Sequence, residues 1–303
     1  MQRAVGGTHR VNGWTIGRSE MEDFCPAVVG SLSEGAAGNP TVAMIEAGFR
    51  HHRLAARYLN AEVAAADLGA AVAGARAMGW IGFNLSIPHK VAVIEHLDGL
   101  GESAAAIGAV NCVVRQPDGR YIGENTDGKG FVASLTSVRP PAGAHVVIVG
   151  AGGAARAIAV ELILAGATSF TIVNRSPARA NDLRNDLRDR LGFAAAVREL
   201  TDGYRVPEGT DVLVNATSVG LYQRDAMIPI DVASLDPSTV VADVVFNPVD
   251  TALLLAAAAG GCPTVDGLGM LVEQGALAIT YWTGVEPDRS VLRAALVQAT
   301  SST

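Results

Sequence analysis

Three polar side chains surround a short turn in the first third of the chain, and their types suit a small hydroxylated ligand. Asn84 and Ser86 alternate with apolar residues, so both polar groups can leave the end of a strand on one side. Pro88 ends the strand, and Lys90 follows at the start of an expected helix over 91–97. Two hydrogen-bonding groups and one cation predict the floor of a small-molecule site. An ordinary strand–helix turn with a solvated lysine is the alternative for this stretch taken alone.

A glycine-rich turn farther along lies between an apolar strand, 146–149, and a helix. In dinucleotide-binding folds the first glycine makes the tight turn, the second lets backbone N–H groups approach a pyrophosphate, and a small third residue lets helix and strand pack closely. The residues expected to contact the dinucleotide are Gly150, Ala151, Gly152, Gly153 and Ala154. A glycine-rich turn without a ligand is the alternative.

The end of the following strand indicates which dinucleotide is bound. NAD sites usually present an acidic residue about 20 positions downstream, which binds the ribose 2′-hydroxyl. Here the region contains Asn174, Arg175, Ser176 and Arg179, and no acid. Guanidinium groups suit the 2′-phosphate of NADP, so the sequence predicts NADP; the alternative is that both arginines are surface charges at a helix end.

A polar turn at 215–220 follows another apolar strand of the same unit. Ligands of open α/β sheets collect at such strand ends. Thr217 and Ser218 are therefore expected to line the nicotinamide side of a cleft, with simple turn chemistry as the alternative.

Strands and helices alternate along most of the chain, which predicts parallel-type α/β layers. The first unit is expected to have strands at 26–29, 57–63 and 80–83, with residues 1–24 as a loose extension. The proline-containing run 139–143 marks a boundary before a second α/β unit. At 303 residues the chain is long enough for two domains.

The bulk composition argues against several classes of partner. The net charge is -7 and no basic tract occurs, which argues against nucleic acid and anionic membranes. An apolar leader and a membrane-length apolar stretch are both missing from the sequence, and three widely spaced cysteines fit a reducing compartment, so a cytoplasmic location is expected. No metal site is expected, because the histidines lack matching ligand pairs and look like surface or helix residues. These histidines are His51, His52, His89 and His96.

Taken together, the motifs resemble those of the shikimate dehydrogenase family, which includes quinate/shikimate dehydrogenases. They occur in the family's order and cover about residues 80 to 285. The matching stretches are 84–90, 107–111, 125–131, 150–155, 174–179, 215–218 and 269–274. The resemblance implies an α/β fold of two domains: a substrate-binding domain formed by 1–127 and 267–303, and a Rossmann NADP-binding domain formed by 128–266.

The resemblance also implies roles for individual residues. Lys90 and Asp127 match the catalytic pair; Lys90 is expected to stay charged and donate a proton, and Asp127 to orient it. The residues expected to bind substrate hydroxyls are Asn84, Ser86, Asn111, Asn125 and Gln274, those expected to bind its carboxylate are Ser31 and Ser33, and Gly267 is expected at the cofactor. The implied reaction is reversible hydride transfer between NADPH and 3-dehydroshikimate, giving shikimate, by a monomer or homodimer.

Three positions depart from the family's pattern. Gly30 and Glu34 flank the Ser-x-Ser motif where the family usually has histidine and proline, and Phe246 replaces a common tyrosine. These departures concern the substrate rather than the fold or the cofactor. A dehydrogenase for quinate, aminoshikimate or another cyclic polyol acid is the first alternative, and a non-catalytic NADP-binding sensor is the second.

Overall fold

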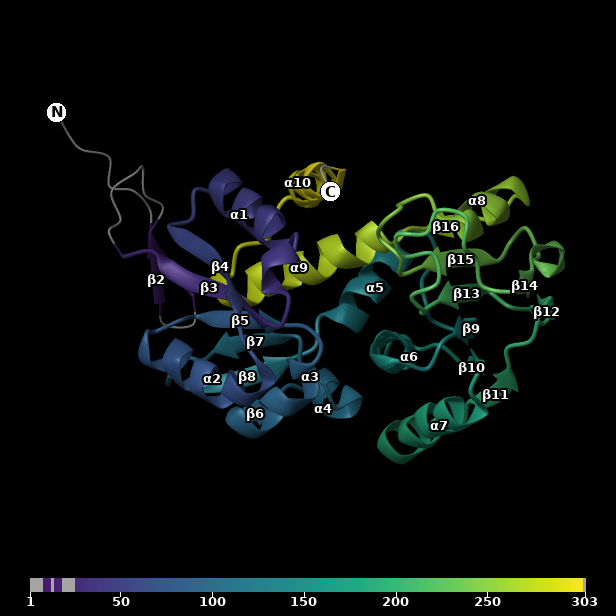
Figure 1. The fold of residues 1–303 in the computed structure, drawn as a ribbon, viewed down its shortest axis with the longest axis horizontal. Helices are drawn as coiled ribbons and strands as arrows, with labels where there is room; N and C mark the ends of the chain where they lie inside the picture. The colour runs from purple at the N-terminus through teal and green to yellow at the C-terminus, as the bar shows by residue number, and fades with distance from the viewer. Residues whose placement is uncertain (1–7, 12–13, 18–24, 302–303) are drawn as a thin grey trace. The chain divides into compact units, whose positions relative to one another are not determined.

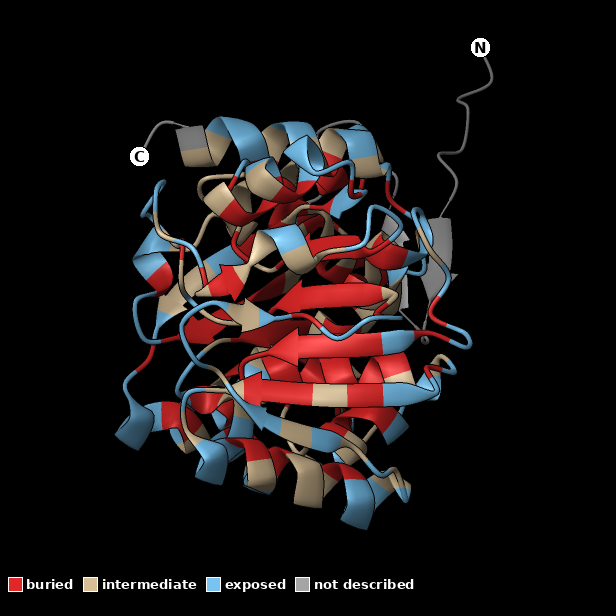
Figure 2. Ribbon diagram, turned by 90° about the vertical axis from the view of Figure 1, so that its right-hand side faces the viewer, coloured by how far each residue is buried: buried red, intermediate tan, exposed pale blue. Residues whose placement is uncertain are grey.

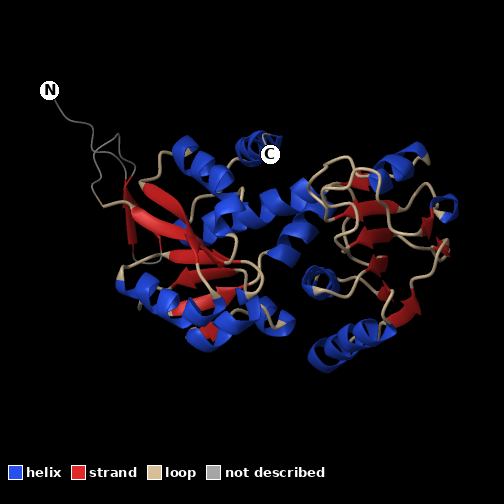
Figure 3. Ribbon diagram, in the orientation of Figure 1, coloured by secondary structure: helices blue, strands red, loops and turns tan. Residues whose placement is uncertain are grey.

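The computed structural model describes residues 8–11, 14–17 and 25–301. The chain divides into two compact units (Figure 1). The first contains residues 1–126 and 275–303, and the second contains residues 127–274. Each unit has its own six-stranded sheet with helices against it, so the expected α/β fold class is confirmed (Figure 3). Among the described residues, no helix is both long and apolar enough to span a membrane.

The sheet of the first unit is mixed rather than parallel throughout. Its strands, in spatial order, are β4 (Ala56–Glu62), β3 (Ala27–Ser33), β5 (Gly82–Leu85), β7 (Cys112–Arg115), β8 (Tyr121–Glu124) and β6 (Gly99–Leu100). β3 runs parallel to β4 and β5, whereas β7 runs antiparallel to β5 and β8. The parallel layer predicted from the first three strands is therefore confirmed, and the sheet becomes mixed at β7. The short turn around Gly119 makes β7 and β8 antiparallel, because strands joined by so few residues must be antiparallel.

Helices cover both faces of this sheet. They are α1 (Thr41–His51), α2 (Leu68–Ala77), α3 (His89–Ala92), α4 (Glu102–Ile107), α10 (Arg289–Ser301) and the 275–283 part of α9 (Gly267–Thr283), with short 3-10 turns at Ala36–Gly38, Ala65–Asp67 and Val93–His96. Figure 1 shows α2 and α4 on one side of the strands and α1 and α10 on the other. Leu68 and Val72 of α2 pack with Leu32 and Phe83 of the sheet in one buried cluster.

Three local predictions for this unit need correction. The strand predicted at 26–29 continues to Ser33, because every residue of β3 pairs with β4. The helix predicted over 91–97 begins at His89 and changes to a 3-10 turn at Val93. The extension expected over 1–24 contains two antiparallel strands in its described part, β1 (Thr8–Val11) and β2 (Trp14–Gly17); the rest of it lies outside the described residues.

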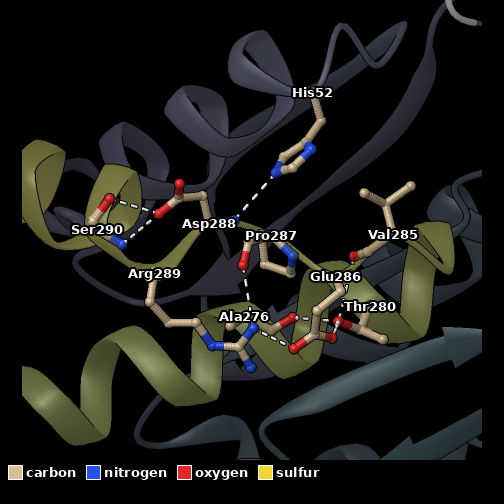
Figure 4. Close-up of polar contacts among 9 residues, drawn as sticks. All are labelled: His52, Ala276, Thr280, Val285, Glu286, Pro287, Asp288, Arg289 and Ser290. Carbon is tan, nitrogen blue, oxygen red and sulfur yellow. Dashed lines mark hydrogen bonds and ion pairs between the residues drawn. The ribbon is translucent and has the colours of Figure 1, made fainter.

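The C-terminal segment is fixed to the rest of the first unit by buried and surface contacts. Trp282 Nε1 donates to the backbone carbonyl of Val113 at 3.0 Å. Figure 4 shows the connection between α9 and α10, where the Asp288 N–H donates to His52 Nε2 at 3.1 Å. The Asp288 carboxylate in turn accepts from the backbone N–H of Ser290 at 2.8 Å, which caps the start of α10.

The sheet of the second unit is entirely parallel. Its strands, in spatial order, are β11 (Ala196–Glu199), β10 (Ser169–Asn174), β9 (His145–Val149), β13 (Val212–Asn215), β15 (Val240–Asp243) and β16 (Thr264–Val265). Counted along the chain from β9, this is the 3-2-1-4-5-6 order of the Rossmann fold, with the strand order reversing beside β9. The central strands are buried on both faces (Figure 2), which explains their uninterrupted apolar sequences.

The remaining elements of the second unit surround this sheet. They are α5 (Asp127–Thr136), α6 (Gly153–Leu164), α7 (Pro177–Leu191), α8 (Ala252–Ala259), the start of α9, a 3-10 turn at Val232–Ser234, and a small parallel pair, β12 (Tyr204–Arg205) and β14 (Ile230–Asp231).

Candidate functional site

In the first unit, a row of polar residues lies at the carboxyl ends of three parallel strands. The strand register places Ser31 of β3 between Asn60 of β4 and Asn84 of β5. Two residues farther along, Ser33 pairs with Glu62. Paired residues of neighbouring strands project from the same face of a sheet, so these side chains share one face. The sequence-predicted residues Ser31, Ser33 and Asn84 are thereby brought together.

Tyr58 belongs to the same row, and its contacts connect β4 to β5. Its hydroxyl donates to Asn84 Oδ1 at 3.1 Å, and Asn84 Nδ2 donates to the backbone carbonyl of Asn111 at 3.0 Å. Burial raises the pKa of the Tyr58 phenol well above its usual value. Sequence reasoning missed Tyr58 and Asn60. The available signal was the spacing of two between Tyr58, Asn60 and Glu62, which places all three on one face of a strand.

The turn after β5 positions Ser86 and Lys90. The Ser86 N–H donates to Ser33 Oγ at 3.1 Å, and the Ser86 carbonyl accepts from the His89 N–H at 2.8 Å. Lys90 is half-buried in α3, and its carbonyl accepts from the Val110 N–H at 2.8 Å. Backbone hydrogen bonds at His89 and at Lys90 itself therefore fix the main chain that carries this cation.

His89 is the first residue of α3, in agreement with its interpretation as a helix histidine, but it is fully buried and is not a surface residue. Its Nε2 lies 2.8 Å from the carbonyl of Val63, so Nε2 carries the proton and donates. Nδ1 is buried and has no hydrogen-bond partner. The ring connects the start of α3 to the end of β4 and acts as a packing residue there.

Asn111 and Asn125 are buried and bind the backbone that leads into the second unit. Asn111 Nδ2 donates to Thr126 Oγ1 at 2.9 Å, and the Thr126 N–H donates to Asn111 Oδ1 at 2.7 Å. Asn125 Nδ2 donates to the carbonyl of Ala109 at 3.1 Å. Both amides thus hold the chain in place immediately before Asp127.

In the second unit, the glycine loop has the form that a pyrophosphate requires. Gly150 has a φ of 119°, and its N–H donates to the carbonyl of Val173 at 2.8 Å. A Cβ at Gly150 would lie 2.8 Å from the carbonyl oxygen of Ala216. A Cβ at Gly152 or Gly153 would meet no atom within 4 Å, so the start of α6 is open to a ligand. Ala151 and Ala154 are partly exposed beside it, and these residues fit a dinucleotide phosphate.

Two arginines at the end of β10 are available for a second phosphate. Arg175 and Arg179 are exposed, and neither forms an ion pair within the part of the chain that the structure describes. Ser176 is the N-cap of α7, where its Oγ accepts from the Arg179 N–H. Asn174 Nδ2 donates to the carbonyl of Ser176 at 3.0 Å, which fixes the turn between strand and helix.

The turn after β13 is shaped by Asn215. Asn215 Oδ1 accepts from both the N–H and the Oγ1 of Thr217, at 3.1 and 2.7 Å. Asn215 Nδ2 donates to Asp243 Oδ1 at 3.0 Å, and Asp243 Oδ2 accepts from Thr251 Oγ1 at 2.8 Å. Burial raises the pKa of the Asp243 carboxyl despite these hydrogen bonds. Ser218 is exposed at the tip of the turn, beside the strand-order reversal of the sheet.

Three further predicted site residues lie on two helices of the second unit: Asp127 on α5, and Gly267 and Gln274 on α9. Gly267 begins α9, and a Cβ there would lie 2.7 Å from the backbone carbon of Val244. Asp127 is the half-buried first residue of α5, and Gln274 Nε2 donates to the carbonyl of Leu271 at 3.2 Å. A Cβ at Gly130 would lie 2.7 Å from the Gln274 nitrogen, so the glycine lets α5 and α9 pack closely.

Gly30 and Phe246, two of the three positions that depart from the family's pattern, lie against aromatic side chains. A Cβ at Gly30 would lie 2.9 Å from Cζ3 of Trp80, so the indole occupies the space that a larger residue needs. Phe246 packs edge to face against Tyr222, with ring centroids 6.3 Å apart. Within the described residues, no group of three or more His, Cys, Asp and Glu side chains could hold a metal ion.

Comparison with known proteins identifies the family. Three family models match the chain: the shikimate dehydrogenase substrate binding domain over residues 39–113, the shikimate / quinate 5-dehydrogenase over 135–228, and the shikimate 5'-dehydrogenase C-terminal domain over 267–297. The curated NADP(+) shikimate dehydrogenase of Shouchella clausii is 40% identical over 252 residues, which cover 82% of this chain and 90% of that relative.

Two solved structures resemble the chain over nearly their whole length. The ligand-free 5-ketofructose reductase of a Gluconobacter species is 51% identical, with a TM-score of 0.89 over 91% of this chain and 99% of that one. The shikimate 5-dehydrogenase of Thermus thermophilus, solved with NADP(H) and shikimate, is 33% identical. Its TM-score is 0.78, over 90% of this chain and 99% of that one. The chain therefore belongs to the shikimate dehydrogenase family.

Proposed function

We propose that this chain is an NADP-dependent oxidoreductase that interconverts a ketone and a secondary alcohol in a polyhydroxylated substrate. The observation that carries the proposal is the nucleotide half of the site. An open glycine loop at the start of α6 suits the pyrophosphate, and two arginines without ion-pair partners among the described residues suit the 2′-phosphate of NADP. The curated relatives, named for NADP(+), support the same cofactor.

The proposed chemistry assigns the proton to Lys90. NADPH, when bound, supplies the hydride that the carbonyl carbon gains during ketone reduction. The carbonyl oxygen must then gain one proton. The Lys90 ammonium stabilises the negative charge that develops on this oxygen and donates the proton. Asp127 orients the ammonium and one substrate hydroxyl. Both side chains are half-buried, so each remains accessible to a ligand.

The first candidate pair is 3-dehydroshikimate and shikimate, the reaction for which the curated relatives are named. In this assignment the substrate hydroxyls bind amide and hydroxyl side chains, namely Asn84, Ser86, Asn111, Asn125 and Gln274. Ser31 and Ser33 bind the carboxylate. The comparisons do not favour the quinate alternative, since the curated relatives are shikimate dehydrogenases.

The second candidate is the reduction of a keto sugar such as 5-ketofructose. A specific observation favours it, because the 5-ketofructose reductase structure is 51% identical over 91% of this chain, whereas the curated shikimate dehydrogenases are near 40%. A keto sugar carries several hydroxyls and a ketone, as 3-dehydroshikimate does, but it has no carboxylate.

Steady-state assays of the purified chain test the proposal. Shikimate and quinate are offered with NADP and with NAD, and 3-dehydroshikimate and 5-ketofructose are offered with NADPH and with NADH. We expect turnover of at least one ketone–alcohol pair, with NADP(H) strongly preferred. Tight NADPH binding without turnover of any of these compounds would instead support the non-catalytic sensor.

A further inference from the structure

A directed series of hydrogen bonds begins at Asn84. Its Nδ2 donates to the carbonyl of Asn111 at 3.0 Å, which leaves Oδ1 of the same amide as an acceptor. The Tyr58 hydroxyl lies 3.1 Å from Oδ1, so the phenol donates its proton there.

The two serines hydrogen-bond to each other. Ser31 Oγ and Ser33 Oγ are 2.8 Å apart, so one of the two hydroxyls donates its proton to the other. Ser33 Oγ in turn accepts from the Ser86 N–H at 3.1 Å. The protons of Tyr58 and of one serine are therefore used within the protein, and Tyr58, Ser31 and Ser33 are each at most 3% exposed.

This arrangement is unfavourable for a carboxylate ligand. An ionised carboxylate has only acceptor oxygens, so it needs donors from its site. The serine pair can offer it the proton of one hydroxyl only, because the other proton is used between the two serines. Donation by both serines would break the hydrogen bond between them, which is costly in a low-dielectric interior.

The residues around the two serines add negative charge. Glu34 directly follows Ser33, and its Oε1 accepts from the Ala65 N–H at 3.0 Å. Glu62 is the strand partner of Ser33, and its Oε1 accepts from the Gly35 N–H at 2.5 Å. Neither glutamate forms an ion pair among the described residues, and both are exposed. Two carboxylates this close to Ser33 repel a third.

One unsatisfied atom in the row is also an acceptor. Asn60 pairs with Ser31 in the register, and its Nδ2 donates to the carbonyl of Asn39 at 3.2 Å. Its Oδ1 is buried and has no hydrogen-bond partner. A hydroxyl group can donate to such an oxygen, whereas a carboxylate cannot.

We infer that the Ser31–Ser33 end of the site binds an uncharged, hydroxyl-bearing group, so that the substrate class is a neutral polyhydroxy ketone and its alcohol rather than a hydroxy acid. The inference rests on the NADP-dependent redox activity proposed above and decides between its two candidates. It agrees with the 51% identity to a 5-ketofructose reductase, whose substrate has no carboxylate.

A substrate pair that differs in the charge of one group tests the inference. Shikimate and its methyl ester are oxidised with NADP under identical conditions, and 5-ketofructose is reduced with NADPH. We expect kcat/KM for the ester to exceed that for the acid by at least about ten-fold, and 5-ketofructose to be turned over efficiently. If the acid is oxidised as well as the ester or better, the inference is wrong while the NADP-dependent activity stands. If none of the three compounds is turned over, the proposed function fails, and the inference with it.

Variants of the surrounding residues identify the cause of the preference. Glu34→Gln keeps the side chain's size and its acceptor for Ala65 but removes the charge, so kcat/KM for the acid should rise about three-fold or more while that for the ester stays constant. Glu95→Gln, at an exposed glutamate outside the site, is the control and should leave the ratio of kcat/KM for the acid to kcat/KM for the ester unchanged. An unchanged ratio of kcat/KM for the acid to kcat/KM for the ester in Glu34→Gln overturns the inference.

Discussion

Asn215 donates a hydrogen bond from Nδ2 to the buried carboxylate of Asp243, at 3.0 Å, across the ends of two neighbouring strands. The two residues are register partners in β13 and β15. The same Asn215 amide fixes the following turn through Thr217. The buried pair therefore supports the turn at the strand-order reversal, where a dinucleotide would bind.

Asp243→Asn should change how the stability of the protein depends on pH. Burial raises the pKa of Asp243 in the folded state above its unfolded value of about 3.9. The folded state then binds more protons than the unfolded state between the two pKa values, so this residue's contribution to stability falls as the pH rises through that window. We expect the wild type to gain stability relative to Asp243→Asn as the pH is lowered from neutrality toward 4. Urea unfolding at several pH values measures this difference.

The control for that experiment is Asp236→Asn, because the contribution of Asp236 to stability changes with pH in the opposite direction. The Ser238 hydroxyl and N–H lower the pKa of the exposed Asp236 carboxyl. The contribution of Asp236 is therefore present above the unfolded pKa and is lost as the pH falls through the folded pKa. If the free energies of unfolding of the two variants depended on pH in the same way, the opposite pKa shifts of Asp243 and Asp236 would be contradicted.

Lys90→Met should abolish most turnover without affecting cofactor binding. The methionine keeps the length of the side chain but can neither donate a proton nor stabilise negative charge, so kcat should fall by about 10²- to 10⁴-fold. NADPH affinity, measured by the fluorescence of the nucleotide, should stay constant. Lys129→Met is the matched control, because Lys90 and Lys129 are the chain's two lysines. Turnover in Lys90→Met close to that of the wild type would refute the catalytic assignment.

The second unit could be predicted from the sequence more completely than the first. Residues 146–149 of β9 and 212–214 of β13 are buried and apolar, and the glycine motif places the nucleotide loop directly after β9. β11 was missed because it is a polar, largely exposed edge strand that forms only by pairing with β10. Local sequence carries no signal for such pairing.

The polar row in the first unit shows why part of the site escaped prediction. Ser31, Ser33 and Asn84 belong to recognisable motifs, but Tyr58 and Asn60 come from a strand without one. Their relevance depends on the pairing of β4 with β3, which joins positions about 29 residues apart in the sequence. The direction of the hydrogen bonds depends in turn on the contact of Asn84 with Asn111, which only the folded structure provides.

Arg175→Ala should weaken the binding of NADPH and leave that of NADH nearly unchanged. A charge-assisted hydrogen bond to a phosphate is worth about 1.5–3 kcal/mol, so KM for NADPH should rise by roughly ten-fold to a hundred-fold. NADH lacks the 2′-phosphate, and its KM should change little. Arg188→Ala is the control, since Arg188 is also exposed near α7's far end and pairs with Asp189. Equal losses for both cofactors would show that Arg175 acts on the fold rather than on the phosphate.

Trp282→Phe should destabilise the first unit more than Trp80→Phe does. Both indoles are largely buried, at 2% and 7% exposed, but only that of Trp282 has a backbone partner in the described structure, the carbonyl of Val113 at 3.0 Å. Phenylalanine cannot donate to this carbonyl, and an unpaired buried acceptor costs about 1–3 kcal/mol. We expect Trp282→Phe to lose that amount beyond the loss of ring contacts, which the Trp80→Phe control also suffers. Urea unfolding of both variants measures the difference, and equal free energies of unfolding would show that the Trp282–Val113 hydrogen bond adds no net stability.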